Sequence, residues 1–109
     1  MNDDLATRTG LPSHAIGKLR SLFACWPAVE SVVLYGSRAK GNFRPGSDID
    51  ITILGEGVAL DDLLRIDTAI DDLLLPWTVD LSRRVDIENP DLLAHIDRVG
   101  IELYRRSPQ

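Results

Sequence analysis

The sequence predicts a mixed α+β fold in which a small mixed β-sheet is flanked by helices. Helical and strand-like periodicities alternate along the chain, and one segment alternates strictly between apolar and polar residues. The hydrophobic fraction of 44% and the charged fraction of 27% are normal for a globular protein. A length of 109 residues predicts one domain over residues 1–109. We expect its elements in the order helix, strand, strand, helix, strand, helix, strand.

The first half of the chain predicts one helix and two strands. Ser13 is a good N-cap, and apolar residues then recur at helical spacing until Pro27 ends the run. Residues Val29–Tyr35 are rich in β-branched and aromatic side chains, which favours a strand. Asp48–Leu54 places isoleucines at alternate positions with polar residues between them. That pattern predicts a half-buried strand.

A second helix is predicted from about Ala59 to Leu74, because its apolar residues fall on one face and its charged residues on the other. Pro76 ends this helix, since the residue before proline disfavours helical dihedrals. The segment Trp77–Leu81 then predicts a third strand.

The last third of the chain predicts a capped helix and a short strand. Asn89 is expected at the N-cap, with Pro90 at the first helical position. Gly100 stands where a C-terminal cap residue is expected. Residues Ile101–Tyr104 are expected to add an edge strand.

Composition excludes several classes of protein. The net charge is −5, from 17 acidic and 12 basic residues, so the broad basic surface of a nucleic-acid-binding protein is missing. Apolar runs are too short for a membrane span, and no leader is visible. The single cysteine, Cys25, suits a reducing cytoplasm and is expected to be a small core residue. We therefore expect a cytoplasmic protein that contacts neither nucleic acid nor membrane.

Carboxylates are the main candidates for chemistry. Asp48 and Asp50 should lie on one side of their strand, opposite the isoleucines. A hard divalent cation would relieve their repulsion, and Mg²⁺ typically uses one or two carboxylates together with the phosphates of its substrate. Asp80 lies between two apolar strand residues and should also point away from the core. If the two strands are neighbours, three carboxylates converge, and such a cluster can hold two metal ions ~3.5–4 Å apart.

A glycine-containing turn precedes these carboxylates. Gly36 would let the backbone approach a phosphate, and Ser37 offers a hydroxyl and an N–H group. Arg38, Lys40 and Arg44 place positive charge around the same loop. His14 and His95 have no second His or Cys at ligand spacing, so neither is expected to bind a metal.

The pattern Gly36-Ser37, ten residues, then Asp48-Ile49-Asp50, with a later carboxylate on a strand, resembles the DNA polymerase β-type nucleotidyltransferase superfamily. The fuller text G-S-R-A-K-G…R-P-G-S-D-I-D-I is similar to its smallest branch, the minimal nucleotidyltransferase (MNT) proteins. This resemblance extends from about Leu11 to Tyr104. Tyr35 stands where phenylalanine is common in the family, and it is not expected to touch the chemistry.

The resemblance implies a nucleotidyltransferase fold and a role for each motif residue. Gly36 and Ser37 would hold the β- and γ-phosphates of a nucleoside triphosphate, with ATP as the expected substrate. Asp48 and Asp50 would bind two Mg²⁺ ions, and Asp80 would ligate the catalytic metal and help to deprotonate the acceptor hydroxyl. Further nucleotide contacts are expected from Arg38, Arg44 and Ser47.

The resemblance also implies a partner. MNT proteins typically pair with a helical HEPN-domain toxin, and some transfer AMP from ATP to a tyrosine hydroxyl of that toxin. Two alternatives stay open: a catalytically silent antitoxin that neutralises its partner by contact, and a nucleotidyltransferase acting on a small molecule. The sequence is also compatible with a homo-oligomer.

Overall fold

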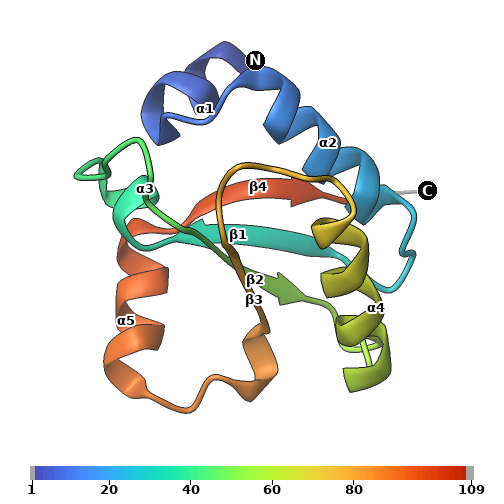
Figure 1. Ribbon diagram of the computed structural model, residues 1–109. Helices are drawn as coiled ribbons and strands as arrows, with labels where there is room; N and C mark the ends of the chain where they lie inside the picture. Colours follow the sequence, from blue (N-terminus) through green and yellow to red (C-terminus); the bar gives the residue numbers. More distant parts are fainter. Residues whose placement is uncertain (1, 108–109) are drawn as a thin grey trace.

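The computed structural model describes residues 2–107 and is built on a four-stranded mixed sheet (Figure 1). The strands lie in the order β3-β2-β1-β4. Strand β1 is antiparallel to both β2 and β4, whereas β2 and β3 are parallel. The strands are β1 (Ser31–Tyr35), β2 (Ile49–Leu54), β3 (Val79–Arg83) and β4 (Ile101–Arg105). The predicted mixed α+β fold is confirmed.

Helices cover both faces of this sheet. Helices α1, α2 and α4 lie on one face, and α5 lies on the other (Figure 1). A short helix, α3, follows β1 directly, and a 3₁₀ turn, η1, follows β3. The helical elements are α1 (Asn2–Thr9), α2 (Ser13–Ala24), α3 (Ser37–Lys40), α4 (Leu60–Asp71), η1 (Arg84–Asp86) and α5 (Pro90–Val99).

The isoleucine face of β2 forms the centre of the core. Ile49, Ile51 and Ile53 are at most 2% exposed, and they pack in one cluster with Phe23 of α2 and Ile66 of α4. Burial of each such side chain contributes ~1.5–3 kcal/mol. Because side chains alternate along a strand, this burial leaves the polar residues of β2 on the opposite face, beside α5 and η1. The predicted half-buried strand is confirmed.

The start of α2 differs from the prediction. The N-cap is Pro12, and no side chain caps the helix, so the expectation that Ser13 is the N-cap was wrong. Pro12 has an extended backbone, with φ −63° and ψ 149°, and its carbonyl accepts from the N–H groups of Ala15 and Ile16. The helix therefore begins one residue earlier than a serine cap would allow. It ends at Ala24, two residues before Trp26.

Helix α4 and strand β3 also shift relative to the prediction. The helix ends at Asp71 because Leu73 and Leu74 donate to carbonyls three residues back, and Leu74 has a φ of +56°. Strand β3 begins at Val79, where parallel pairing with Ile49 starts, and not at Trp77. The strand runs to Arg83 because pairing with β2 continues past Leu81.

Two further features of the first 25 residues were not anticipated. Helix α1 had no predicted counterpart, yet its Leu5 is only 7% exposed and joins the core cluster. Cys25 is exposed just after the end of α2, so the expectation of a core cysteine was wrong. Its thiol donates to the carbonyl of Ser21.

The end of the chain follows the prediction closely. The Asn89 side chain accepts from the N–H groups of Asp91 and Leu92, with Pro90 at the first helical position. Gly100 is the C-cap of α5, and β4 is an edge strand beside β1. Within residues 2–107, no helix is long and apolar enough to cross a membrane.

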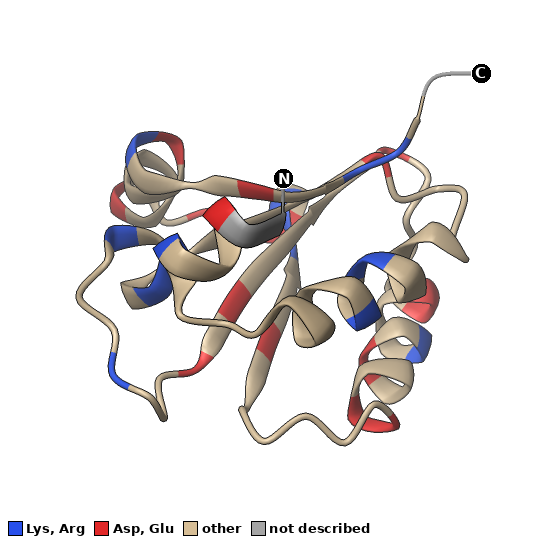
Figure 2. Ribbon diagram, turned by 90° about the horizontal axis from the view of Figure 1, so that it is seen from above, with Lys and Arg blue, Asp and Glu red and all other residues tan. Residues whose placement is uncertain are grey.

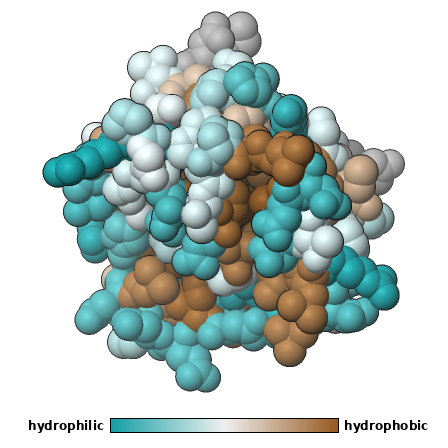
Figure 3. Space-filling model, viewed as in Figure 1, coloured by the Kyte–Doolittle hydropathy of each residue, from teal (hydrophilic) through white to brown (hydrophobic). Residues whose placement is uncertain are grey.

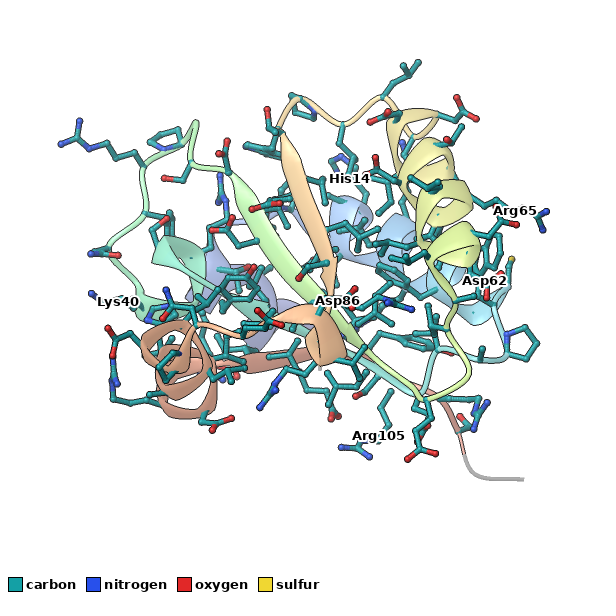
Figure 4. All side chains as sticks on the ribbon, turned by 90° about the horizontal axis from the view of Figure 1, so that it is seen from below. His14, Lys40, Asp62, Arg65, Asp86 and Arg105 are labelled. Atoms are coloured by element: carbon teal, nitrogen blue, oxygen red, sulfur yellow. The ribbon has the colours of Figure 1, made fainter. Side chains whose placement is uncertain are left out.

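Charged side chains are spread over the outer surface of the helices and loops. Figure 4 shows Lys40 and Arg65 on opposite sides of the molecule, pointing outward. Arg65 pairs with Asp61 at 3.1 Å, and Arg83 donates to both carboxylate oxygens of Asp86. Exposed pairs of this kind contribute ~0–1 kcal/mol each, so they do not determine the fold.

Candidate functional site

The sheet brings two predicted carboxylates into register. Asp50 of β2 pairs with Asp80 of the parallel strand β3, on the face opposite the core isoleucines. Asp48 lies immediately before β2 and is exposed, as is Asp80, whereas Asp50 is half-buried. Figure 2 shows acidic segments (red) on adjacent strands in the same part of the sheet. Strands β2 and β3 are therefore neighbours, which is the condition for their carboxylates to lie close together.

The three carboxylates do not form a ready-made metal cage. Within the described residues, no three His, Cys, Asp or Glu side chains are arranged to hold one metal ion. The expectation of a preassembled three-carboxylate cluster is therefore not met. The donor chemistry still suits Mg²⁺, because this ion usually takes only one or two protein carboxylates and completes its shell with water and substrate phosphates.

The ionised form of Asp50 is electrostatically unfavourable in this position. Burial raises the pKa of its carboxyl above the ordinary value of 3.8, and the nearby charges of Asp80 and Asp48 raise it further. The site thus holds more negative charge than its own residues neutralise, which is the electrostatic condition for attracting a cation.

Gly36 forms the turn between β1 and α3 in direct contact with this carboxylate. Its backbone has φ +76° and ψ −157°, a conformation that side-chain-bearing residues rarely adopt. A Cβ at this position would lie 2.2 Å from Oδ2 of Asp50. Glycine is therefore required both for the turn and for the close approach of the Asp50 carboxylate to the backbone.

His95 completes the turn from the other side. The N–H of Gly36 donates to Nε2 of His95 at 3.0 Å, and the His95 ring meets the Tyr35 ring edge-on at 6.3 Å between centroids. His95 was not among the predicted site residues, because a lone histidine 59 residues after Gly36 gives no local signal. Only the packing of α5 against β1 reveals it.

Tyr35 lies beside the candidate site, a position that the sequence did not indicate. It pairs with Asp50 across β1 and β2 and is 8% exposed. Nearby on the same face, the Ser82 hydroxyl of β3 donates to the hydroxyl of Thr52 of β2 at 3.0 Å. Burial, with Asp80 and Asp50 nearby, raises the pKa of Tyr35, so the Tyr35 hydroxyl keeps its proton beside the carboxylates.

The remaining loop residues differ in how accessible they are. Ser37 is the first residue of α3 and is half-buried beside Gly36. Arg44 is exposed, and its backbone N–H donates to the hydroxyl of Ser47 at 2.8 Å. Ser37 and Arg44 are therefore placed where a ligand could meet their side chains, while Ser47 also closes the loop.

A comparison with known protein families identifies the family of this chain. Residues 17–109 match the family described as "Polymerase beta, Nucleotidyltransferase", and this match covers most of the chain. The chain belongs to this nucleotidyltransferase family.

Solved structures share the fold of this nucleotidyltransferase. A chain of a toxin–antitoxin complex crystallised with AMP-PNP is 22% identical, with a TM-score of 0.67 over 84% of this chain and 73% of that chain. A complex of a tri-AMPylated Shewanella oneidensis HEPN toxin with its MNT antitoxin gives 19% identity and a TM-score of 0.62, over 85% and 71% of the two chains. A putative nucleotidyltransferase from Sulfolobus solfataricus gives 18% identity and a TM-score of 0.54, over 96% and 87%. A search of curated proteins gives no significant match.

Arg38 has a structural role in this nucleotidyltransferase. It is 1% exposed, and its guanidinium donates to the carbonyls of Thr9, Pro45 and Ser47 at 2.9–3.0 Å. The rings of Phe43 and Trp77 lie 5.3 Å and 5.5 Å from the guanidinium carbon.

This burial revises the prediction that Arg38 contacts a nucleotide. The guanidinium is enclosed by carbonyls and aromatic rings, and burial lowers its pKa below the ordinary arginine value. Arg38 instead fixes the loop between α3 and β2, the loop that ends at Asp48.

Replacing Asp50 with Asn is expected to stabilise the metal-free nucleotidyltransferase at neutral pH. A raised carboxyl pKa means that the folded state binds this proton more tightly than the unfolded chain does, so ionisation of Asp50 destabilises the fold. Below the ordinary value of 3.8 the wild type and Asp50→Asn should be equally stable, and the variant should gain as pH rises through the higher folded-state pKa. Urea unfolding in the presence of a chelator, measured across this pH range, tests whether the substitution raises the stability of the fold. Asp67→Asn on α4 is the exposed control. A variant less stable than wild type at pH 7 would mean that the Asp50 carboxylate supports the fold.

Proposed function

We propose that this chain is a Mg²⁺-dependent nucleotidyltransferase of the antitoxin type, which transfers AMP from ATP to a tyrosine hydroxyl of a partner HEPN-type toxin. The observation that carries the proposal is the register of Asp50 with Asp80 directly beside the Gly36 turn. Two relatives of the same fold support the toxin partner and the nucleotide. One is a toxin–antitoxin complex with AMP-PNP, and the other contains a tri-AMPylated HEPN toxin with its MNT antitoxin.

In this proposal each site residue has a defined task. Asp48, Asp50 and Asp80 would hold Mg²⁺, which would supply charge neutralisation for the triphosphate and the developing transition state. Gly36 and Ser37 hold the β- and γ-phosphates, and Arg44 and Ser47 lie on the loop beside them. Asp80 is the exposed carboxylate on the edge strand, so an incoming hydroxyl can reach it and lose its proton to it.

Transfer then requires in-line attack by the acceptor oxygen on the α-phosphorus of ATP. A bond from that oxygen to phosphorus forms, the bond from phosphorus to the bridging oxygen breaks, and pyrophosphate leaves. Catalysis comes mainly from positioning and from electrostatic stabilisation of the phosphates. No residue of the chain forms a covalent intermediate in this scheme.

The surface of the protein suits a macromolecular acceptor. Leu60 and Leu64 of α4, together with Leu74 after it, are 59–86% exposed. Figure 3 shows apolar surface (brown) between hydrophilic regions on one side of the molecule. Large exposed apolar side chains such as Leu60 and Leu64, one turn apart on α4, occur at protein-binding surfaces, and the net charge of −5 favours a basic partner.

The direct test first asks whether a neighbouring gene encodes a helical HEPN-type protein, and then uses that protein as the partner of the chain. Intact mass spectrometry after incubation with ATP and Mg²⁺ should show one or more AMP groups on the partner and none on a partner whose acceptor tyrosine is replaced by phenylalanine. A neutralised partner of unchanged mass would indicate the silent antitoxin. AMP appearing only on small molecules would indicate the small-molecule enzyme.

Replacing Ser37 with Ala should weaken ATP–Mg²⁺ binding more than it changes folding. One neutral hydrogen bond contributes roughly 0.5–1.5 kcal/mol, which corresponds to about a 2- to 12-fold rise in Kd. Calorimetric titration with ATP–Mg²⁺ gives the affinity, and a thermal melt gives the stability. If affinity is unchanged while the melting temperature falls sharply, Ser37 serves the fold and not the nucleotide.

A further inference from the structure

We infer that His95 is a positioning residue for nucleotide binding, because it fixes the Gly36–Ser37 turn through a hydrogen bond from α5. This inference rests on the proposed function, since it assumes that the turn receives the triphosphate. It adds a residue that the sequence motif does not contain.

The turn needs an external restraint. Glycine populates positive and negative φ values about equally, so the sequence alone does not hold Gly36 at φ +76°. The Gly36 N–H is restrained by Nε2 of His95 at 3.0 Å. This bond links the loop on one strand end to a helix 59 residues later in the chain.

His95 is itself held in place. It is half-buried on α5, which packs against β1, and its ring meets Tyr35 edge-on at an interplanar angle of 82°. Tyr35 directly precedes Gly36, so His95 contacts two consecutive residues of the turn. A ring fixed in this way can impose one direction on the Gly36 N–H.

The hydrogen bond also defines what His95 does not do. An imidazole nitrogen that accepts a hydrogen bond carries no proton, so the hydrogen of the neutral ring lies on Nδ1. His95 therefore acts on the nucleotide through the turn, by orienting Ser37 and keeping the Gly36 backbone against Asp50. Its Nε2 is occupied by the Gly36 N–H, so this nitrogen positions the turn and does not contact a phosphate.

Two substitutions separate the hydrogen bond from the packing. His95→Phe keeps an aromatic ring beside Tyr35 but removes the acceptor, whereas His95→Gln removes the ring but keeps an acceptor near the position of Nε2. Loss of the acceptor should raise the Kd for ATP–Mg²⁺ about 3- to 10-fold in the Phe variant. The Gln variant should stay within about 2-fold of wild type. His14→Gln on the exposed start of α2 is the matched control and should not change the Kd.

Amide hydrogen exchange provides a readout that needs no nucleotide. The Gly36 amide should be protected in wild type and in His95→Gln, and it should exchange at least about tenfold faster in His95→Phe. Fast exchange of the Gly36 amide in wild type would overturn the inference, as would a Phe variant that binds ATP–Mg²⁺ like wild type while the Gln variant does not. A wild-type protein that fails to bind ATP–Mg²⁺ would instead overturn the proposed function, and the exchange measurement would still report on the hydrogen bond.

Discussion

Nucleotidyl transfer is expected to fall at least ~100-fold when Asp50, Asp80 or Asp48 is replaced singly by Asn, because each ~1.4 kcal/mol lost in transition-state stabilisation reduces the rate tenfold. The substitution keeps the size of the side chain and removes the charge. Asp50 should show the largest loss, since its carboxylate lies between Gly36 and Asp80 in the paired strands. The measurement is single-turnover transfer of labelled AMP to the partner at saturating ATP–Mg²⁺.

The control for this series removes a carboxylate elsewhere. Glu56 lies in the exposed turn after β2, so Glu56→Gln changes the net charge by the same amount without touching the site. It should retain wild-type transfer. Near-wild-type turnover in Asp50→Asn would contradict the two-metal scheme. A loss in Asp50→Asn with full activity in Asp80→Asn would leave Asp80 without the role of accepting the hydroxyl proton.

The same substitution separates catalysis from folding. Asp50→Asn is expected to be more stable than wild type without metal, since Asp80 and Asp48 repel the Asp50 charge. Addition of Mg²⁺ with a non-hydrolysable ATP analogue should reverse this order. A ligand at a hundredfold excess over its Kd contributes ~2.7 kcal/mol to the folded state, and only the intact site gains this in full.

The carboxylate positions were predictable because they depend on local periodicity. Strict alternation around Ile51 fixed which side of β2 faces the core, and the same reasoning placed Asp80 on the outer side of β3. The sequence did not fix that β2 and β3 are neighbours. That adjacency arises from the packing of α4, which connects the two strands across one face of the sheet.

The contributions of His95 and Tyr35 were not predictable in this way. A lone histidine on an amphipathic helix is most often a packing residue, and its bond to Gly36 depends on how α5 lies against β1. Tyr35 differs from the residue common in the family by one hydroxyl, and its position beside Asp50 depends on the pairing of β1 with β2. Contacts between distant segments leave no local pattern to detect.

Arg38 shows that a basic residue beside a glycine turn is not always available to a ligand. A cation two residues after a glycine turn predicts an anion ligand, and the sequence analysis assigned it to the nucleotide. Its guanidinium is instead 1% exposed and bonded to three backbone carbonyls. The difference comes from α1, the helix that was not predicted, because its last residue, Thr9, supplies one of those carbonyls.

Replacing Arg38 with Ala is therefore expected to destabilise the fold by ~3 kcal/mol or more, because a hydrogen bond to a charged group contributes ~1.5–3 kcal/mol and a buried carbonyl left unpaired costs ~1–3 kcal/mol. The carbonyl of Thr9 should account for most of the loss, since Thr9 is fully buried. The carbonyl of Pro45 keeps a donor, Nε1 of Trp77, at 2.9 Å. Phe43 and Trp77 would also lose the cation between them.

Urea unfolding measures this loss, and two further variants define its cause. Arg44→Ala removes an exposed cation from the same loop and should change the stability by at most ~0.5 kcal/mol. Arg38→Lys keeps the charge, but an ammonium group lacks the planar fork that reaches three carbonyls at once, so this variant should recover only a minor part of the loss. Equal stability of Arg38→Ala and Arg44→Ala would show that the loop holds its shape without the buried guanidinium. Transfer should fall together with stability in Arg38→Ala, because the loop that Arg38 fixes delivers Asp48 to the start of β2.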